Sequence, residues 1–332
     1  MTRNYWQIAA GSRGRDYSSY FLKTGMAFVG GESQMATMAQ VKLGDVVVLK
    51  SGLSQILAAG EVVERNGRHS GNGDKGWLRD FDGWDLAAYC YVRWHVPTEP
   101  QKTPRLTRPT IQQLPQDKHR KLADKLLQLP PAPEGNEPRQ TSEVPDDAIL
   151  EFLITEGLRP GTADELTNTL RRIRLLAEYY YNNCQWSDVR EHETRSFLIL
   201  PLLLSLGWAE QQVKIELPAG GGRADVACFS NPYHREDSEC TLILESKDFA
   251  TGLDYAPEQV RRYAQDFGSC RVVVVSNGYC YKAYLRSPES GFSSTPSAYL
   301  NIMRPRDRYP LDPENVGGAL DLLRWLLPQS LR

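Results

Sequence analysis

Acidic and basic side chains stand at the ends of two apolar segments in the C-terminal half of the chain. Asp225 precedes the apolar run 226–229, and the run 242–244 ends in Glu245, with Lys247 two positions later. Alternate residues of an extended strand share a face, so Glu245 and Lys247 point the same way. If the two segments pair as a hairpin, Asp225 reaches the same place. The spacing therefore predicts two carboxylates and one amine around a common point.

Two carboxylates beside a lysine suit one particular chemistry. Mg²⁺, for which Mn²⁺ can substitute, is bound in proteins by one or two carboxylates together with water and substrate phosphate. A divalent ion there can lower the pKa of a water and stabilise the charge that builds on a scissile phosphate. The lysine can orient or deprotonate that water, or neutralise the intermediate. The alternative is that these residues are ordinary solvated strand ends, but the apolar runs beside them place them at the mouth of a core.

The surrounding sequence has the pattern of a mixed α/β domain. Helical spacing of apolar residues covers 163–181, 192–206, 257–267 and 319–327, and strand-like runs cover 213–217, 224–229, 241–245, 271–276 and 281–286. We therefore expect a mixed sheet flanked by helices between residues 146 and 332.

Several motifs of this half resemble the N-terminal nuclease domain of type I restriction enzyme motor subunits, within the PD-(D/E)xK superfamily. The segments that carry the resemblance are ETRSFLILPLLLSLGW at 193–208, RADV at 223–226, LESK at 244–247, QVRRY at 259–263, and VVVSNG at 273–278 followed by YKAY at 281–284. They span roughly residues 185–290. One departure is that the sequence holds no P-loop and no helicase motor, so we expect no restriction coupled to translocation.

The resemblance implies an α/β restriction-endonuclease-like core and a role for each motif residue. The implied metal ligands are Asp225, Glu245 and Glu193, and the implied catalytic residues are Lys247, Glu245, Asp225, Gln259 and Glu193. The residues implied to position DNA are Tyr263, Arg223 and Arg262. Gln259 and Tyr263 are four positions apart, so they share one face of a helix, as a QxxxY element requires. The alternatives are structural: Glu193 as an acid favoured at a helix N-terminus, and Tyr263 as a core residue.

Residues 1–97 form a small β-rich domain in our prediction. Strand patterns cover 5–10, 46–49, 56–63 and 89–94, with glycine-rich turns between them. In pattern and order these segments resemble the small PUA/EVE-like β-barrels, several of which bind modified bases. A flipped base needs aromatic stacking and polar contacts at its edge. The candidate pocket residues are Trp6, Tyr17, Tyr20, Trp77, Trp84, Arg13 and Arg15; the alternative is that most of these aromatic residues form the core.

A proline-rich connector is expected between the two domains, over residues 98–145. Proline recurs there and excludes long regular elements, except one short helix near 117–129. The predicted organisation is a barrel over 1–97, a connector over 98–145 and a nuclease domain over 146–332.

Composition narrows the class of protein. The chain has 39 basic and 41 acidic residues, so nucleic-acid binding would depend on local patches rather than on net charge. No apolar run is long enough to span a bilayer and no signal segment opens the chain, so we expect a cytoplasmic protein without a membrane partner. The six cysteines contain no CxxC pair, which disfavours structural zinc, and we expect reduced thiols rather than disulfides.

The sequence thus favours a magnesium-dependent DNA endonuclease that acts in modification-dependent restriction or another form of antiphage defence. Cutting both strands usually needs two active sites, so we expect a homodimer. Two alternatives remain open. One is a catalytically silent protein that binds nucleic acid, which would bind DNA in a salt-dependent manner without cutting it. The other is a nuclease switched on by a nucleotide second messenger bound at the N-terminal domain.

Overall fold

The structure is a computed structural model of the 332-residue chain, and it describes all residues except 1–2, 12–14, 184–187, 235–238, 255 and 332. The chain divides into two compact units. The first unit comprises Met1–Ser12 and Asp16–Pro138, and the second comprises Arg13–Arg15 and Arg139–Arg332. Each unit has its own sheet.

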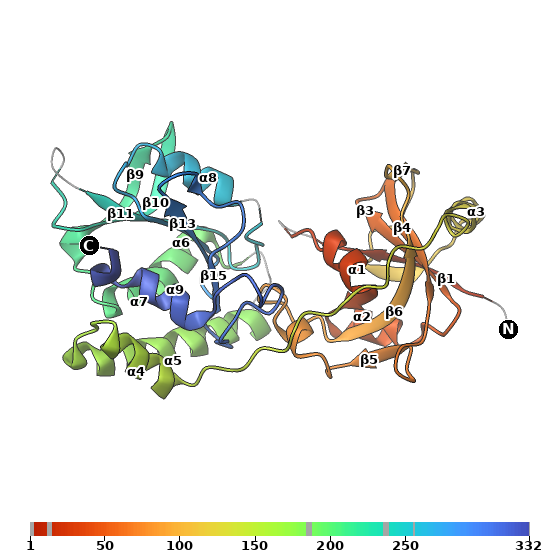
Figure 1. Cartoon of the computed structure of the whole chain (residues 1–332), viewed down its shortest axis with the longest axis horizontal. Coiled ribbons are helices and arrows are strands. Elements are labelled where there is room, and N and C mark those ends of the chain that lie inside the picture. Colours follow the sequence, from red (N-terminus) through yellow and green to blue (C-terminus); the bar gives the residue numbers. More distant parts are fainter. Residues whose placement is uncertain (1–2, 12–14, 184–187, 235–238, 255, 332) are drawn as a thin grey trace. The chain divides into compact units, whose positions relative to one another are not determined.

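The first unit contains a curled sheet that forms a half-barrel (Figure 1). Its strands are β1 (Tyr5–Ala9), β2 (Met26–Val29), β3 (Val46–Ser51), β4 (Gln55–Val62), β5 (Ser70–Asn72), β6 (Ala88–His95), β7 (Gln101–Lys102) and β8 (Ile111–Gln113). The order is β2-β6-β4-β3-β1-β8, with β5 on β6 and β7 on β4. The strand β1 runs parallel to β3, and the other pairs are antiparallel. The helices are α1 (Ser18–Thr24), α2 (Glu32–Met38) and α3 (Asp117–Leu126), with the 3-10 turn η1 (Gly76–Asp80).

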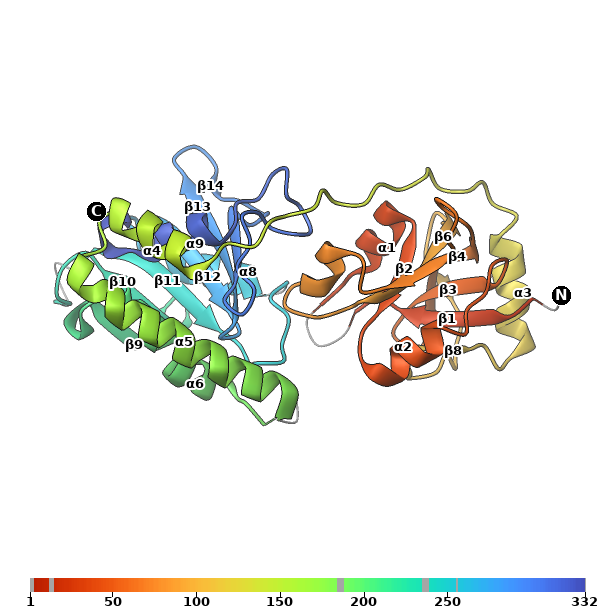
Figure 2. The ribbon, with the colours of Figure 1, turned by 90° about the horizontal axis from the view of Figure 1, so that it is seen from below.

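Much of the expected connector belongs to the first unit. The strand β8 pairs with β1, and α3 lies where a short helix was predicted (Figure 2). Leu106, Leu114, Ala123 and Leu126 are buried in one apolar cluster with residues of β3 and β4. These side chains add apolar area to a small sheet, which explains why the segment packs although it is rich in proline. The boundary between the units therefore falls between Pro138 and Arg139, rather than at both ends of a connector over 98–145.

The second unit is a mixed sheet with helices on both faces, so the α/β class expected from the sequence is observed. Its strands are β9 (Val213–Ala219), β10 (Gly222–Phe229), β11 (Cys240–Ser246), β12 (Val272–Ser276), β13 (Cys280–Ser287), β14 (Gly291–Phe292) and β15 (Ala298–Asn301). Its helices are α4 (Asp146–Thr155), α5 (Pro160–Asn183), α6 (Glu191–Thr194), α7 (Leu200–Ser205), α8 (Ala256–Ala264) and α9 (Ala319–Leu326); the short turns are η2 (Arg195–Ile199), η3 (Glu210–Gln212) and η4 (Pro328–Leu331).

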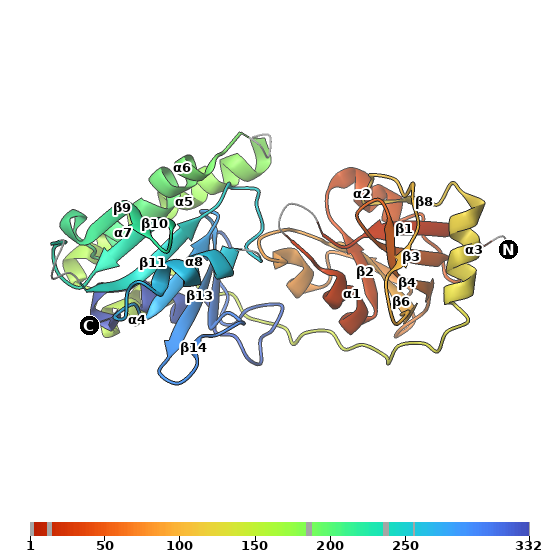
Figure 3. The same cartoon turned by 90° about the horizontal axis from the view of Figure 1, so that it is seen from above.

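The order of this sheet is β14-β13-β12-β11-β10-β9, with β15 on β13. The central strands β11 and β12 are parallel and are joined through α8, whereas β10 and β11 are antiparallel. Figures 1 and 3 show α8 on one face of the sheet and α4, α5, α7 and α9 on the other. Every residue of β11 and β12 is buried, as expected for strands covered on both faces. Within the described residues, no helix combines the length and the apolar character that crossing a bilayer requires.

A π-helical turn, η2, interrupts the helical segment that runs from α6 to α7. Pro201 lies just after this turn. Proline has no N–H and its ring clashes with the carbonyl four residues earlier, here that of Phe197, so a regular α-helix cannot continue through it. A wider turn accommodates the proline, and single π-turns of this kind are frequent at functional sites. The first residue of the turn is Arg195, which faces the candidate site.

Candidate active site

Asp225 and Glu245 lie opposite one another on neighbouring antiparallel strands. The register pairs Val226 with Leu244, and its next step outward brings Asp225 level with Glu245. Residues directly opposite each other in an antiparallel pair point to the same face of the sheet. Both carboxylates are buried, with 6% and 2% of the residue exposed. The hairpin that the spacing suggested is therefore present, and it brings the two acids together.

Lys247 joins this pair from the end of β11. Its Nζ lies 2.6 Å from Glu245 Oε1 and 3.4 Å from Gln259 Oε1 on α8. Gln259 Nε2 in turn donates to the Tyr263 hydroxyl at 2.9 Å, one helical turn further along α8. A chain of side-chain hydrogen bonds thus runs from Glu245 through Lys247 and Gln259 to Tyr263. The i, i+4 spacing on α8 gives the shared face that the sequence predicted.

Both oxygens of the Asp225 carboxylate accept hydrogen bonds. Oδ2 accepts from the backbone N–H of Ser246 at 2.6 Å and from its hydroxyl at 2.8 Å, and Oδ1 accepts from Arg195 Nη1 at 2.8 Å. Thr194, beside Arg195, donates its hydroxyl to the Lys247 carbonyl at 2.9 Å and so holds α6 against the end of β11. Buried charges persist when they are paired and hydrogen-bonded. The contacts therefore fix the position of Asp225 before any ligand binds.

On α6, the acid whose charge interacts with Asp225 and Lys247 is Glu191. Glu193 Oε2 accepts from the backbone N–H of Arg190 at 2.8 Å, so it caps the N-terminus of α6. Glu191 is half-buried; burial, and next the negative charge of Asp225, raise its pKa to about 7. Glu191 lies four positions before Arg195, so the two share a helix face and Glu193 lies off it; the spacing becomes informative once Arg195 is known to face the site.

Glu245 retains an unused acceptor. Burial raises its pKa to about 7; the hydrogen bond from Lys247 opposes this shift, while the charge of Asp225 adds to it. Its Oε2 atom is buried and has no hydrogen-bond partner among the described residues. A buried oxygen of this kind is unfavourable unless something satisfies it. A bound cation would reduce the repulsion between the Asp225 and Glu245 carboxylates, and it would also satisfy Glu245 Oε2. These oxygen ligands fit a hard divalent ion.

The described residues contain no cluster of three or more His, Cys, Asp and Glu side chains arranged as a preformed metal site. Magnesium does not need such a cage, because it keeps several waters and uses one or two carboxylates together with substrate phosphates. Asp225 and Glu245 supply the two carboxylates that this mode requires.

Gly220 and Gly221 form the turn between β9 and β10, Gly222 begins β10, and the three glycines fit beneath α8. Gly220 and Gly221 have φ of +54° and +74°, a conformation that side-chain-bearing residues rarely adopt. A Cβ on Gly222 would lie 2.9 Å from the Tyr263 hydroxyl oxygen. The turn therefore lets the Tyr263 ring pack closely against the start of β10. Tyr263 is itself buried, so it is both a packing residue and a partner of Gln259.

The two arginines expected to position DNA are both exposed. Arg223 is on β10, two residues before Asp225. Arg262 is on α8, and the carbon of its guanidinium lies 5.6 Å from the centre of the Tyr263 ring. Solvent-accessible guanidinium groups around a recessed acidic centre can contact the phosphates of a nucleic acid.

In the first unit, four of the expected pocket residues pack around Phe81. The centre of the Phe81 ring lies 4.3 Å from that of Tyr17, 5.3 Å from that of Tyr20 and 6.0 Å from that of Trp77. The ring centres of Trp84 and Tyr17 are 6.2 Å apart. Phe81 is fully buried, so this aromatic cluster is part of the core.

The remaining pocket candidates lie elsewhere. Trp6 donates its indole N–H to the buried Asp45 at 2.9 Å and thereby ties β1 to the turn before β3. Arg15 belongs with the second unit, and Arg13 lies outside the described residues. The structure therefore groups the two tyrosines with Trp77 and Trp84, and places Trp6 on Asp45.

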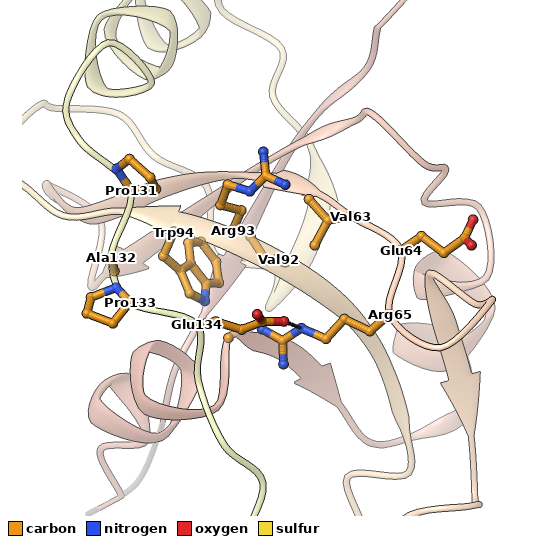
Figure 4. A pocket seen from close by; sticks show the side chains of 11 residues that line it. Val63, Glu64, Arg65, Val92, Arg93, Trp94, Pro131, Ala132, Pro133 and Glu134 are labelled. Atoms are coloured by element: carbon orange, nitrogen blue, oxygen red, sulfur yellow. Dashed lines mark ion pairs between the residues drawn. The ribbon is translucent and has the colours of Figure 1, made fainter.

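A pocket of about 180 Å³ lies at the side of β6 (Figure 4). Trp94, Arg93 and Arg65 line it together with Glu134 and the proline-rich segment 131–133. Two of its charged residues contact each other: Arg65 donates to the Thr24 carbonyl at 2.9 Å and lies 3.5 Å from Glu134 Oε1. Of the residues expected from the sequence to line a pocket, none of the six that the structure describes lines this one. It marks where the segment leading to the second unit follows the edge of β6.

Comparison of the chain with family models, with curated proteins and with solved structures gave no match. The chemistry of the site follows from its geometry. Two buried carboxylates on one face, an unsatisfied oxygen and an adjacent amine can bind a divalent cation and handle a proton beside it.

Proposed function

We propose that this chain is a metal-dependent DNA endonuclease with a PD-(D/E)xK centre on a restriction-endonuclease-like core. The observation that carries the proposal is the opposition of Asp225 and Glu245 on one face of the sheet, with Lys247 Nζ 2.6 Å from Glu245. Strand ends that were merely solvated would not bury both carboxylates or leave Glu245 Oε2 unsatisfied.

In this proposal Asp225 and Glu245 hold Mg²⁺, for which Mn²⁺ substitutes, and Glu191 adds negative charge beside them. A bound divalent ion supplies Lewis acidity toward the scissile phosphate and acidifies a nearby water. The chain's own contribution is rigidity: Ser246 holds Asp225 through two hydrogen bonds, so the carboxylate does not reorganise when the substrate arrives.

Lys247 is the group that handles the proton and the developing charge. Its ammonium lies between Glu245 and Gln259, so its direction is set from two sides. From this position the side chain orients the attacking water and stabilises the negative charge that builds on the phosphate. Gln259 is a positioning residue, because its amide connects Lys247 to Tyr263 on the same helix.

Nucleic acid is the substrate class that this centre favours. Arg223 and Arg262 are exposed near the site and would contact backbone phosphates on either side of the bond that is cut. Phosphate contacts of this kind fix the register of the duplex and carry no sequence information. We assign selection of the DNA to the first unit. The process that we propose is modification-dependent restriction or another antiphage defence. The form that cuts both strands is a homodimer in this proposal.

The test is a cleavage assay with the purified full chain. Supercoiled plasmid DNA, unmodified or carrying methylated or hydroxymethylated cytosine, is incubated with Mg²⁺ or Mn²⁺, and with EDTA as a blank. We expect nicking or linearisation of at least one of these DNAs, dependent on the metal, and its loss in Asp225→Asn. Asp164→Asn, an exposed acid of α5, is the matched control and should cut at the wild-type rate.

Salt-dependent DNA binding without cutting under every metal condition would overturn the nuclease assignment and favour a catalytically silent binding protein. Cleavage that persists in Asp225→Asn would place the active centre elsewhere.

A further inference from the structure

Arg195 is shared between two acids at the candidate site. Its Nη1 atom lies 2.8 Å from Asp225 Oδ1 and 2.8 Å from Glu216 Oε1. The Arg195 side chain is 13% exposed, that of Asp225 8% and that of Glu216 43%. One guanidinium nitrogen therefore has one buried partner and one half-exposed partner.

Glu216 is held in this position by an unusual backbone. The pairs Ala224–Leu217 and Val226–Ile215 on either side put Glu216 opposite Asp225 on the neighbouring strand. Its φ is +55°, in the left-handed region that residues other than glycine rarely enter. Such a conformation is unfavourable and persists only where the surroundings enforce it. The strained residue is the one whose carboxylate meets Arg195.

Asp225 has one oxygen on which cations can compete. Oδ2 is occupied by the two donors of Ser246, so Oδ1 is the oxygen left for a cation, and Arg195 holds it. A guanidinium and a divalent ion at the same carboxylate oxygen repel one another. Arg195, however, already contacts a second carboxylate, that of Glu216, and can stay there without leaving the protein.

We propose that Arg195 is a displaceable counter-cation of Asp225, and that Glu216 retains Arg195 when a divalent cation takes Oδ1. The inference rests on the proposed function, in that it assumes Asp225 to be a metal ligand. It assigns the two residues opposite effects on metal affinity. Arg195 lowers the affinity because it competes, and Glu216 raises it because it draws the guanidinium away.

The experiment measures Mn²⁺ affinity of the full chain by electron paramagnetic resonance of free Mn²⁺, without DNA. We expect Arg195→Gln to bind Mn²⁺ about 10-fold more tightly and Glu216→Gln to bind it about 3- to 10-fold more weakly, as expected for close unit charges near a surface. In the double variant the Glu216 substitution should have no further effect, so its affinity should equal that of Arg195→Gln. Glu210→Gln, an exposed acid just before β9, is the matched control and should match wild type.

Two outcomes overturn the inference. Weaker Mn²⁺ binding by Arg195→Gln would mean that Arg195 holds Asp225 in place for the metal rather than competing with it. Weaker binding on adding Glu216→Gln to Arg195→Gln would mean that Glu216 binds the ion itself. If Arg195→Gln does not fold, Glu216→Gln alone decides, because unchanged or tighter binding contradicts the proposal.

Failure of the proposed function gives a different pattern. Mn²⁺ binding with the expected responses but no DNA cleavage would remove the nuclease assignment and leave the competition between Arg195 and the cation intact. If neither wild type nor Asp225→Asn binds Mn²⁺, the proposed function and the inference about Arg195 are both overturned.

Discussion

Replacing Lys247 by methionine is expected to slow metal-dependent DNA cleavage by about 10³-fold while Mn²⁺ binding is kept. Methionine preserves most of the volume of the side chain and removes its charge and donors. General acid–base and charge-stabilising groups typically contribute about 10²- to 10⁴-fold to a rate. Mn²⁺ affinity should not fall, because the variant removes a positive charge that lies 2.6 Å from Glu245. The measurements are single-turnover cleavage rates and Mn²⁺ titration of the same preparations.

Lys214→Met is the matched control for this experiment. Lys214 lies on β9, where its ammonium is 4.7 Å from the centre of the Tyr233 ring, and it takes no part in the chain of hydrogen bonds through Gln259. The control should cut at close to the wild-type rate. Cleavage by Lys247→Met within a factor of a few of wild type would refute the assigned role of the lysine.

The second large effect is expected in the first unit, where Phe81→Ala should lower the free energy of unfolding by about 3–5 kcal/mol. Phe81 is fully buried and its ring lies within 6.0 Å of those of Tyr17, Tyr20, Phe28 and Trp77. Removing it leaves a cavity that rigid aromatic neighbours cannot easily fill. Denaturant titration followed by tryptophan fluorescence measures the loss, because Trp77 and Trp84 report on this cluster.

This result separates the two interpretations of the aromatic residues. If they form a core, Tyr20→Ala, at the half-buried edge of the cluster, should cost clearly less than Phe81→Ala. If instead they line an open pocket, truncating Phe81 should change the free energy of unfolding by only about 0.5 kcal/mol, the range of ordinary surface substitutions. That outcome would make the aromatic cluster a candidate ligand-binding site again.

The acidic centre was predictable because it depends on short-range rules. The alternation of side chains along a strand placed Glu245 and Lys247 together, and the i, i+4 spacing of a helix placed Gln259 with Tyr263. Pairing of the two apolar runs as neighbouring strands then supplied Asp225. Each step needs only local periodicity and one assumption about which strands are adjacent.

Arg195 and Glu216 could not be found in this way. Their contact depends on the register of β9 against β10, on a π-helical turn set by Pro201 and on a left-handed backbone at a glutamate. None of these three features produces a periodic pattern of residues from which it could be predicted. Glu191 could have been distinguished from Glu193 only once Arg195 was known to face the sheet.

In the first unit, composition alone did not separate core from pocket. Aromatic residues near glycine-rich loops fit both, and packing around Phe81 became visible only with the positions of η1 and α1. The packing of the proline-rich segment was difficult to predict because its sequence has too little pattern. Leu106 and Leu114 are too isolated among polar residues and prolines to predict elements there, yet both are buried in the apolar cluster with residues of β3 and β4.

The central claim is that Asp225 and Glu245 share one divalent cation. A crystal of the full chain soaked in Mn²⁺, with data collected for anomalous scattering, tests it most directly. We expect one strong anomalous peak between the two carboxylates, within bonding distance of an oxygen from each, and no such peak in crystals of Asp225→Asn. A soaked crystal with no peak there, or with its peak at a place that touches neither carboxylate, would contradict the claim.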